Sequence, residues 1–298
     1  MKNHTFGVEI ELTGITRCQA ATVIADYFHT TQTHTGGSYD KYEVRDNQGR
    51  KWTAMSDGSI RTEMKNGTSA SGLYSCEIVT PVCKWEDIAD IQEIVRQLRH
   101  KGAIANSSCG IHVHVGAERQ TAKTLRNLVN IMTSKEDLMF KALGVTASRE
   151  GRWCKKNEER FVQTINSSKP QTTEAIERIW YNGNSRRSYH YDDSRYRALN
   201  LHSLWQGKGI EFRCFNGTNH AGKIKTYIQL CLAICNQALT QNAASYKKTQ
   251  TTNDKYTFRT WLLRLGMIGD EFETARKFLL ENLSGDTAFR YGRTRAAA

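Results

Sequence analysis

The sequence contains no apolar run close to the roughly 20 residues that a membrane-spanning helix needs. It also has no apolar stretch near its start, where Met1-Lys2-Asn3-His4 leads directly into an acidic, strand-like segment. A secretory signal requires such a stretch. We therefore expect a soluble, cytoplasmic protein without a membrane-embedded part.

The cysteines do not occur at the short paired spacings that are typical of a zinc ribbon or a compact disulfide scaffold. The eight cysteines are scattered over positions 18, 76, 83, 109, 154, 214, 231 and 235. Cys231 and Cys235 lie four apart in an apolar, helix-like run, where small thiols pack well in a core. We expect reduced cysteines that contribute to packing rather than to redox chemistry.

The motifs of several common enzyme classes are missing as well. There is no Gly-x-x-x-x-Gly-Lys-Ser/Thr loop, and no Gly-x-Gly-x-x-Gly segment follows a strand and opens a helix. A P-loop or Rossmann nucleotide site is therefore not expected. The sequence also lacks a Gly-x-Ser-x-Gly elbow and a His-Glu-x-x-His helix. The motifs that usually indicate a serine hydrolase or a zincin are therefore missing.

The sequence does contain enough apolar residues for a core, together with an excess of positive charge. Of its 298 residues 39% are hydrophobic, and 42 Lys and Arg against 30 Asp and Glu give a net charge of +12. This length corresponds to one large domain or two modest ones. The charge allows partners such as nucleic acid, phosphates or acidic polymers, but it does not indicate a reaction.

Hydrophobic periodicity predicts a mixture of strands and helices. The predicted strands lie near residues 5–12, 39–44, 51–55, 73–79, 110–115 and 210–215, and the predicted helices near 17–29, 85–100, 125–132, 221–240, 258–265 and 271–283. Residues 149–193 are polar and basic and predict loops with short helices, and residues 290–295 resemble a frayed basic tail. Because strands and helices do not alternate strictly, the pattern favours an α+β fold with a largely antiparallel sheet.

Charged or ligand-capable residues recur two apart within segments patterned as buried strands. The three pairs are Glu9 and Glu11, His112 and His114, and Glu211 and Arg213. Residues two apart on a strand share one face. Burial of an unpaired carboxylate costs several kcal/mol, so such a face needs compensating positive charge. A divalent cation supplies it, and carboxylates with an imidazole suit Mg²⁺ or Mn²⁺.

Each pair also has a simpler interpretation when it is taken alone. Glu9 and Glu11 are compatible with the solvated face of a half-exposed strand, and the two histidines with ordinary core or surface positions. Glu211 and Arg213 are compatible with an ordinary ion pair, which contributes little to folding stability if it is exposed to solvent. The three pairs together favour a shared site.

Six motifs occur in an order that resembles the putative amidoligase family. They are Phe6-Gly7-Val8-Glu9-Ile10-Glu11, Asp57-Gly58-Ser59, Glu77-Ile78-Val79-Thr80-Pro81, Cys109-Gly110-Ile111-His112-Val113-His114, Arg195-Tyr196 with Asn200, and Gly209-Ile210-Glu211-Phe212-Arg213. That family consists of carboxylate-amine ligases with a glutamine synthetase-like fold. The resemblance implies a mainly antiparallel sheet that forms a funnel-shaped site, with helices on its outer face. It suggests one domain over residues 1–298, with a helical C-terminal extension at about 245–298.

The resemblance also implies a site that holds ATP with Mg²⁺ or Mn²⁺. The residues that match the family's metal ligands are Glu9, Glu11, Glu77, His112 and Glu211. Arg213 would contact the transferred phosphoryl group, while Arg195 and Asn200 would help to hold nucleotide or substrate. His114 would face the phosphate or substrate side. Asp57 is a candidate general base, as is Glu63, although Asp57-Gly58 is also typical of a hairpin turn.

The implied reaction activates a carboxylate as an acyl phosphate and joins it to an amine. The carboxylate would come from a small molecule, a peptide or a modified nucleobase, and the sequence does not choose among them or indicate an oligomeric state. A different class of function is nucleic-acid binding through the basic and aromatic residues of 149–197, which also read as a lid over the nucleotide. A third possibility is phosphate transfer to a guanidino acceptor.

Overall fold

The computed structural model describes residues 1–291. The chain divides into two compact units that interleave along the sequence. We call residues 2–115 and 215–228 the sheet unit, and residue 1 with 116–214 and 229–291 the helical unit. Because the units interleave, this division does not decide whether the chain is one domain, and that expectation stays a prediction. Each unit is described by itself.

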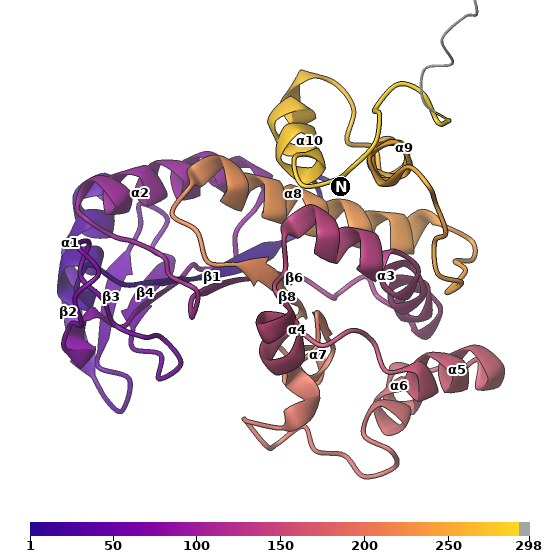
Figure 1. The fold of residues 1–298 in the computed structure, drawn as a ribbon. Coiled ribbons are helices and arrows are strands. Elements are labelled where there is room, and N and C mark those ends of the chain that lie inside the picture. Colours follow the sequence, from indigo (N-terminus) through magenta and orange to yellow (C-terminus); the bar gives the residue numbers. More distant parts are fainter. Residues whose placement is uncertain (292–298) are drawn as a thin grey trace, which may run out of the picture. The chain divides into compact units, whose positions relative to one another are not determined.

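The sheet unit contains six strands in the order β2-β3-β4-β5-β1-β6 (Figure 1). They are β1 (Phe6–Leu12), β2 (Gln32–Gly36), β3 (Lys41–Arg45), β4 (Lys51–Met55), β5 (Cys76–Val79) and β6 (Gly110–Val115). All neighbouring strands pair antiparallel. The predicted α+β class with a largely antiparallel sheet is confirmed.

Two helices cover one face of this sheet. Helix α1 (Arg17–Phe28) packs on β3, β4 and β5 and against α2 (Ile88–His100), which follows the short 3₁₀ turn η2 (Trp85–Asp87). The side chain of Thr16 caps α1 through the backbone N–H of Gln19, and the Gln19 side chain returns a bond to the Thr16 N–H. Such a reciprocal cap fixes where the helix begins.

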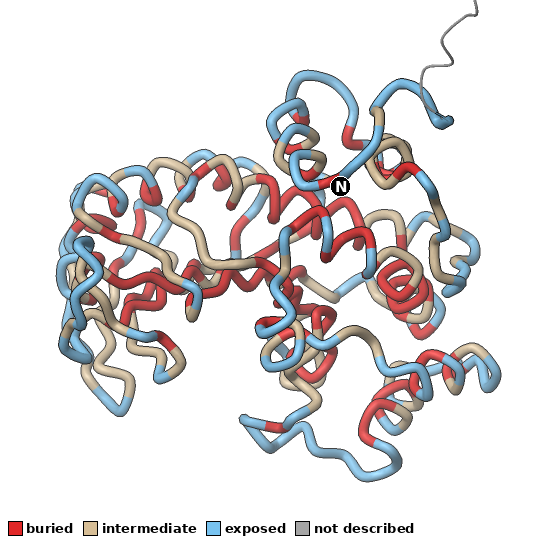
Figure 2. The backbone as a smooth tube through the Cα atoms, in the orientation of Figure 1, coloured by how far each residue is buried: buried red, intermediate tan, exposed pale blue. Residues whose placement is uncertain are grey.

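Strand β1 lies inside this sheet and alternates as the sequence predicts. Val8, Ile10 and Leu12 are buried among apolar side chains, while Glu9 and Glu11 point to the opposite face because successive side chains alternate. Figure 2 shows that buried residues run through the central strands and along the packed sides of the helices. The core therefore supports β1 from one face and leaves its carboxylates on the other.

The helical unit is built mainly from short helices around α3 (Ala122–Leu143). Helix α3 packs against α5, α6 and α10. The other elements are α4 (Ala147–Trp153), α5 (Glu159–Ser168), α6 (Thr173–Trp180), η3 (Asp193–Arg195), β7 (Leu199–Asn200), α7 (His202–Trp205), α9 (Asp254–Arg264), η4 (Asp270–Phe272) and α10 (Glu273–Leu280). Strand β8 (Ile210–Asn216) and helix α8 (Ala221–Thr240) each begin in one unit and end in the other.

Most elements lie where the periodicity predicts them, with two differences. The segment predicted as a strand over 73–79 opens with the 3₁₀ turn η1 (Gly72–Tyr74), so that only Cys76–Val79 is strand. Strand β2 is missing from the prediction because Gln32–Gly36 is polar and shows no apolar alternation. The basic tail predicted at 290–295 lies largely outside the described residues.

The polar stretch 149–193 folds into three helices, α4, α5 and α6, joined by loops, as the sequence suggests. Two helices, α9 and α10, lie in the segment predicted as a helical extension. Within residues 1–291, none of the helices is both long enough and apolar enough to cross a membrane.

Candidate functional site

The register of the central strands brings the predicted carboxylates and imidazoles of the sheet unit onto one face. Glu11 of β1 lies directly opposite Glu77 of β5, and Glu9 lies directly opposite His112 of β6. His114, two residues further along β6, shares that face. Residues as far apart in sequence as Glu9 and His112, which are separated by 103 positions, therefore meet on three neighbouring strands.

Glu11, Glu77 and His112 form a compact set of possible metal ligands. Each offers one ligand atom, and these atoms all lie within 4.8 Å of one another. Their side chains are buried, with residue exposures of 4%, 7% and 5%. Two carboxylates this close together in a buried place repel each other unless a cation lies between them. Two hard oxygen donors and one imidazole fit Mn²⁺ or Mg²⁺.

The backbone and a neighbouring side chain help to orient these groups. Glu11 Oε2 accepts a hydrogen bond from the Gly110 N–H at 2.6 Å, which ties this carboxylate to the start of β6. His112 Nε2 lies 3.8 Å from Glu11 Oε1, so this ring nitrogen faces the carboxylate cluster. The other nitrogen of the ring, Nδ1, lies 2.9 Å from Glu9 Oε2.

Glu9 is placed between the two imidazoles of β6. Its second oxygen, Oε1, lies 3.2 Å from His114 Nε2. Burial by itself would raise the pKa of Glu9, but the imidazoles of His114 and His112 outweigh it and hold this pKa well below its usual range. An ionised Glu9 accepts a hydrogen bond from the Nδ1–H of His112, which leaves Nε2 with its lone pair, as a metal-binding histidine requires. Glu9 can thus orient His112 as a metal ligand. Coordination of the metal by Glu9 itself stays a prediction.

The two candidate general bases lie in the long connection between β4 and β5. Asp57 Oδ1 accepts the Ser59 N–H at 2.6 Å, and the Asp57 backbone N–H donates to Ser75 Oγ at 2.9 Å. Asp57-Gly58 therefore opens a connection from Met55 to Cys76 and is not the two-residue hairpin that the dipeptide allows.

Glu63 differs from Asp57 because it already has a cationic neighbour. Its carboxylate forms an ion pair with Arg61 at 2.7 Å. Hydrogen bonds from Arg61 and then Asn106 lower the pKa of Glu63, which makes it a weaker proton acceptor. The Glu63 backbone N–H donates to Thr13 Oγ1 at 2.9 Å, and this contact ties the connection to the residue that follows β1.

A second set of predicted site residues lies in the helical unit, on β7 and β8. Asn200 is directly opposite Glu211, and its Nδ2 donates to Glu211 Oε2 at 2.6 Å. Arg213, two residues along β8, forms an ion pair with Glu211. All three residues are buried. The guanidinium of Arg213 thus lies against the carboxylate of Glu211 and supplies it with positive charge.

Arg195 occupies a different environment in η3. Its guanidinium lies over the rings of Tyr191 and Tyr196, at 5.5 and 5.8 Å from their centroids. Its Nη1 donates to the carbonyl of His190 at 3.4 Å. The structure therefore places Arg195 among aromatic side chains, and its predicted contact with nucleotide or substrate stays a prediction.

Arg17 is a structural contributor that the sequence interpretation missed. It is buried in the first turn of α1, forms an ion pair with Asp40, and donates from Nη1 to the carbonyls of Gly72 and Ser75, both at 2.8 Å. These contacts anchor the chain just before the strand that carries Glu77. The only sequence signal is that a cation in the first turn opposes the helix dipole, which suggests partners elsewhere in the fold.

The family described as "Putative amidoligase enzyme" matches residues 2–235. The chain therefore belongs to this family, which confirms the resemblance seen in the six motifs. Membership supports an enzyme that forms amide bonds. The match includes both sets of predicted site residues and ends before α9. No curated protein matches this sequence.

Proposed function

We propose that this protein is an ATP-dependent carboxylate-amine ligase with a glutamine synthetase-like, funnel-shaped site. The observation that carries the proposal is the buried set of Glu11, Glu77 and His112, whose ligand atoms lie within 4.8 Å of one another. Buried carboxylates lower the stability of a folded chain more than apolar side chains at the same positions would. The presence of this arrangement in a chain of the amidoligase family is explained if it holds the divalent ion that accompanies ATP.

The proposed metal ligands are Glu11, Glu77 and His112, with Glu9 and Glu211 as further candidates. A bound Mg²⁺ or Mn²⁺ would supply positive charge to the β- and γ-phosphates of ATP. Glu9 would keep His112 in the tautomer that presents Nε2, because its Oε2 lies 2.9 Å from Nδ1.

The chain's own residues would support phosphoryl transfer by binding and orienting the reactants. A substrate carboxylate oxygen attacks the γ-phosphorus, ADP leaves, and an acyl phosphate forms. Arg213 would contact the transferred phosphoryl group, and its ion pair with Glu211 would hold the guanidinium in place. Asn200 would in turn orient Glu211 through its hydrogen bond. Arg195 would bind nucleotide or substrate, and His114 would face the phosphate or substrate.

The second step is attack of an amine on the acyl phosphate, with loss of inorganic phosphate. The amine must give up a proton, so a carboxylate must accept it. Because Glu63 is already engaged in an ion pair with Arg61, we favour Asp57 as the general base.

The proposal is tested by a screen of carboxylates and amines with ATP and either Mg²⁺ or Mn²⁺. We expect release of ADP and phosphate together with a product whose mass is the sum of the two substrates less one water. Glu77→Gln should abolish this turnover, whereas Glu86→Gln, an exposed residue outside the site, should retain it. ADP release with a stable phosphorylated product and no amide would instead indicate phosphate transfer to a guanidino acceptor.

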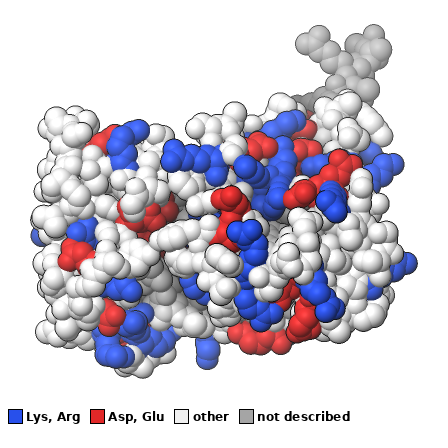
Figure 3. Space-filling view, turned by 90° about the horizontal axis from the view of Figure 1, so that it is seen from below, with Lys and Arg blue, Asp and Glu red and all other residues white. Residues whose placement is uncertain are grey.

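Nucleic-acid binding through residues 149–197 is the alternative from a different class. Cation–aromatic contacts favour it, since Arg152 lies 4.5 Å from the ring centroid of Trp153. Ion pairs oppose it, because Arg186, Arg187 and Arg197 are engaged by carboxylates. Figure 3 shows basic and acidic side chains interspersed on the face that it presents, rather than a continuous basic surface. Binding to DNA that weakens steeply as salt rises would support this alternative.

A further inference from the structure

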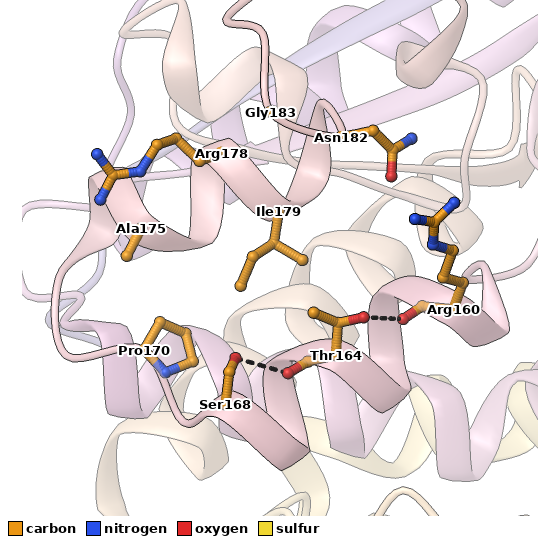
Figure 4. A pocket seen from close by; sticks show the side chains of 9 residues that line it. All are labelled: Arg160, Thr164, Ser168, Pro170, Ala175, Arg178, Ile179, Asn182 and Gly183. Carbon is orange, nitrogen blue, oxygen red and sulfur yellow. Dashed lines mark hydrogen bonds between the residues drawn. The ribbon is translucent and has the colours of Figure 1, made fainter.

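A groove lies between α5 and α6 in the helical unit, within the polar stretch that the proposed reaction does not use. Its volume is about 460 Å³. Nine residues line it: Arg160, Thr164, Ser168, Pro170, Ala175, Arg178, Ile179, Asn182 and Gly183 (Figure 4). None of them is acidic and none is aromatic.

The two walls of the groove are held in place by packing and by the way each helix ends. Phe161 of α5 and Trp180 of α6 pack edge to face with ring centroids 5.0 Å apart. Helix α6 ends with Asn182 in the left-handed region at φ 53°, and the Gly183 N–H donates to the Arg178 carbonyl at 2.7 Å. This is the bond of a Schellman cap. A pre-formed wall lowers the ordering cost of binding.

The lining combines an apolar centre with hydrogen-bonding groups. Figure 4 shows the side chain of Ile179 directed into the groove, with Pro170 across from it. The hydroxyls of Thr164 and Ser168 donate to carbonyls of their own helix, at 2.8 and 2.7 Å. Their oxygen lone pairs can still accept hydrogen bonds from a ligand. This composition suits an extended peptide, whose backbone N–H groups need acceptors.

The charge of the groove comes from its two arginines. Arg160 and Arg178 form no ion pair with any residue in the described part of the chain, whereas Arg186, Arg187 and Arg197 nearby in sequence all do. Figure 4 places Arg160 and Arg178 at opposite ends of the groove, with Ile179 between them. Two guanidinium groups separated by an apolar centre are complementary to carboxylates on either side of an apolar side chain.

We propose that this groove binds an acidic peptide segment in extended form. The carboxylates of the peptide would pair with Arg160 and Arg178, and an apolar side chain between them would contact Ile179. Single-stranded nucleic acid fits less well, because no aromatic ring lines the groove on which a base could stack. This peptide site goes beyond the proposed ligase reaction and does not depend on it.

The test measures binding of a fluorescently labelled peptide of alternating Glu and Leu to the full-length protein by anisotropy at low salt. Arg160→Gln and Arg178→Gln should each weaken binding roughly fivefold, as expected for loss of a partly exposed ion pair. The double variant should lose about 25-fold if the two effects are independent. Arg264→Gln changes charge equally at an exposed position of α9 outside the groove and should leave the affinity within about twofold.

A further variant distinguishes binding in the groove from nonspecific electrostatic attraction of the peptide. Ala175→Glu introduces a carboxylate into the lining and should weaken the peptide at least as much as either single arginine variant. The proposal is overturned if the peptide does not bind, if Arg264→Gln weakens it as much as the groove variants do, or if an oligonucleotide of equal charge binds more tightly and loses affinity in the same variants. Because the assay needs no ATP or metal, its failure is distinct from failure of the ligase proposal.

Discussion

Two buried charged groups in this protein differ in the kinds of side chain that they bring together. On β8 the carboxylate of Glu211 is neutralised by Arg213 and receives a hydrogen bond from Asn200. On β1 and β5, Glu11 and Glu77 lie opposite each other, with one imidazole as the third member of the set. In the first group a guanidinium lies against the carboxylate, whereas the second brings two carboxylates and an imidazole together. The second group therefore offers the ligand atoms that an added cation needs.

The strongest test of this comparison is the removal of one carboxylate from the group on β1 and β5. Glu77→Gln should weaken Mn²⁺ binding on the order of 100-fold or more, because one of the oxygen donors loses its charge. The apo protein should keep its fold, since glutamine has the shape of glutamate and keeps one side-chain oxygen. Electron paramagnetic resonance of free Mn²⁺ measures the affinity, and Glu86→Gln is the control. Equal affinity in Glu77→Gln would remove Glu77 from the metal site.

The group on β8 should respond differently to loss of one partner. Arg213→Ala leaves Glu211 buried without its cation and should destabilise the protein by about 3 kcal/mol. If Arg213 also contacts the phosphoryl group, turnover should fall far more than nucleotide affinity. Denaturant unfolding and steady-state kinetics measure the two effects. Arg213→Lys keeps the charge and separates them, because it should recover most of the stability but not the turnover.

A substitution of Arg17 tests how the strand that carries Glu77 is positioned. Arg17→Met removes the hydrogen bonds to the Gly72 and Ser75 carbonyls and the ion pair with Asp40. We expect a loss of about 2 kcal/mol in the free energy of unfolding and faster proteolysis between residues 56 and 75. Arg45→Met, at an exposed position of β3, is the control. Similar stability and cleavage in both variants would show that Arg17 does not anchor this connection.

The smallest expected effect concerns His202, a buried neutral group of the helical unit. Its Nε2 donates to the Tyr189 carbonyl at 2.9 Å, so its Nδ1 accepts from Tyr181 Oη at 2.5 Å. Burial lowers the pKa of His202, although Asp192 opposes this effect. Below its unfolded pKa of about 6.5 the unfolded chain binds more protons than the folded one, so stability should fall as the pH drops through this range.

The check for His202 is a set of unfolding curves between pH 7.5 and 5, read with a probe in the helical unit. The variant His202→Gln should show a flatter dependence over that interval, because it carries no titrating ring. A wild-type stability that rises as the pH falls would contradict a lowered pKa at this position.

Much of the local structure could be predicted from residue patterns. The two-residue alternation of 6–12 and 110–115 identifies strands and places Glu9 with Glu11, and His112 with His114, on shared faces. The apolar periodicity after Ala221 likewise predicts α8 over its full length. These predictions succeed because a strand or helix imposes its period on the residues of one segment.

Other features had no local signal. Glu77 lies in a strand of only four residues, and nothing near it indicates that it pairs with Glu11 rather than with another residue. The pairing follows from the register of β1 against β5, which depends on which apolar face each strand buries. The groove between α5 and α6 likewise depends on how two short helices pack.

The sequence by itself therefore determined the strand and helix periods, the family and the types of residue available for a metal site. Tertiary structure alone decided that Glu11 faces Glu77, that Glu9 lies between two imidazoles, and that Arg160 and Arg178 form no ion pair within residues 1–291. The physical reason is that periodicity is a property of one segment. Charge balance, in contrast, depends on the neighbours that distant segments bring to each side chain.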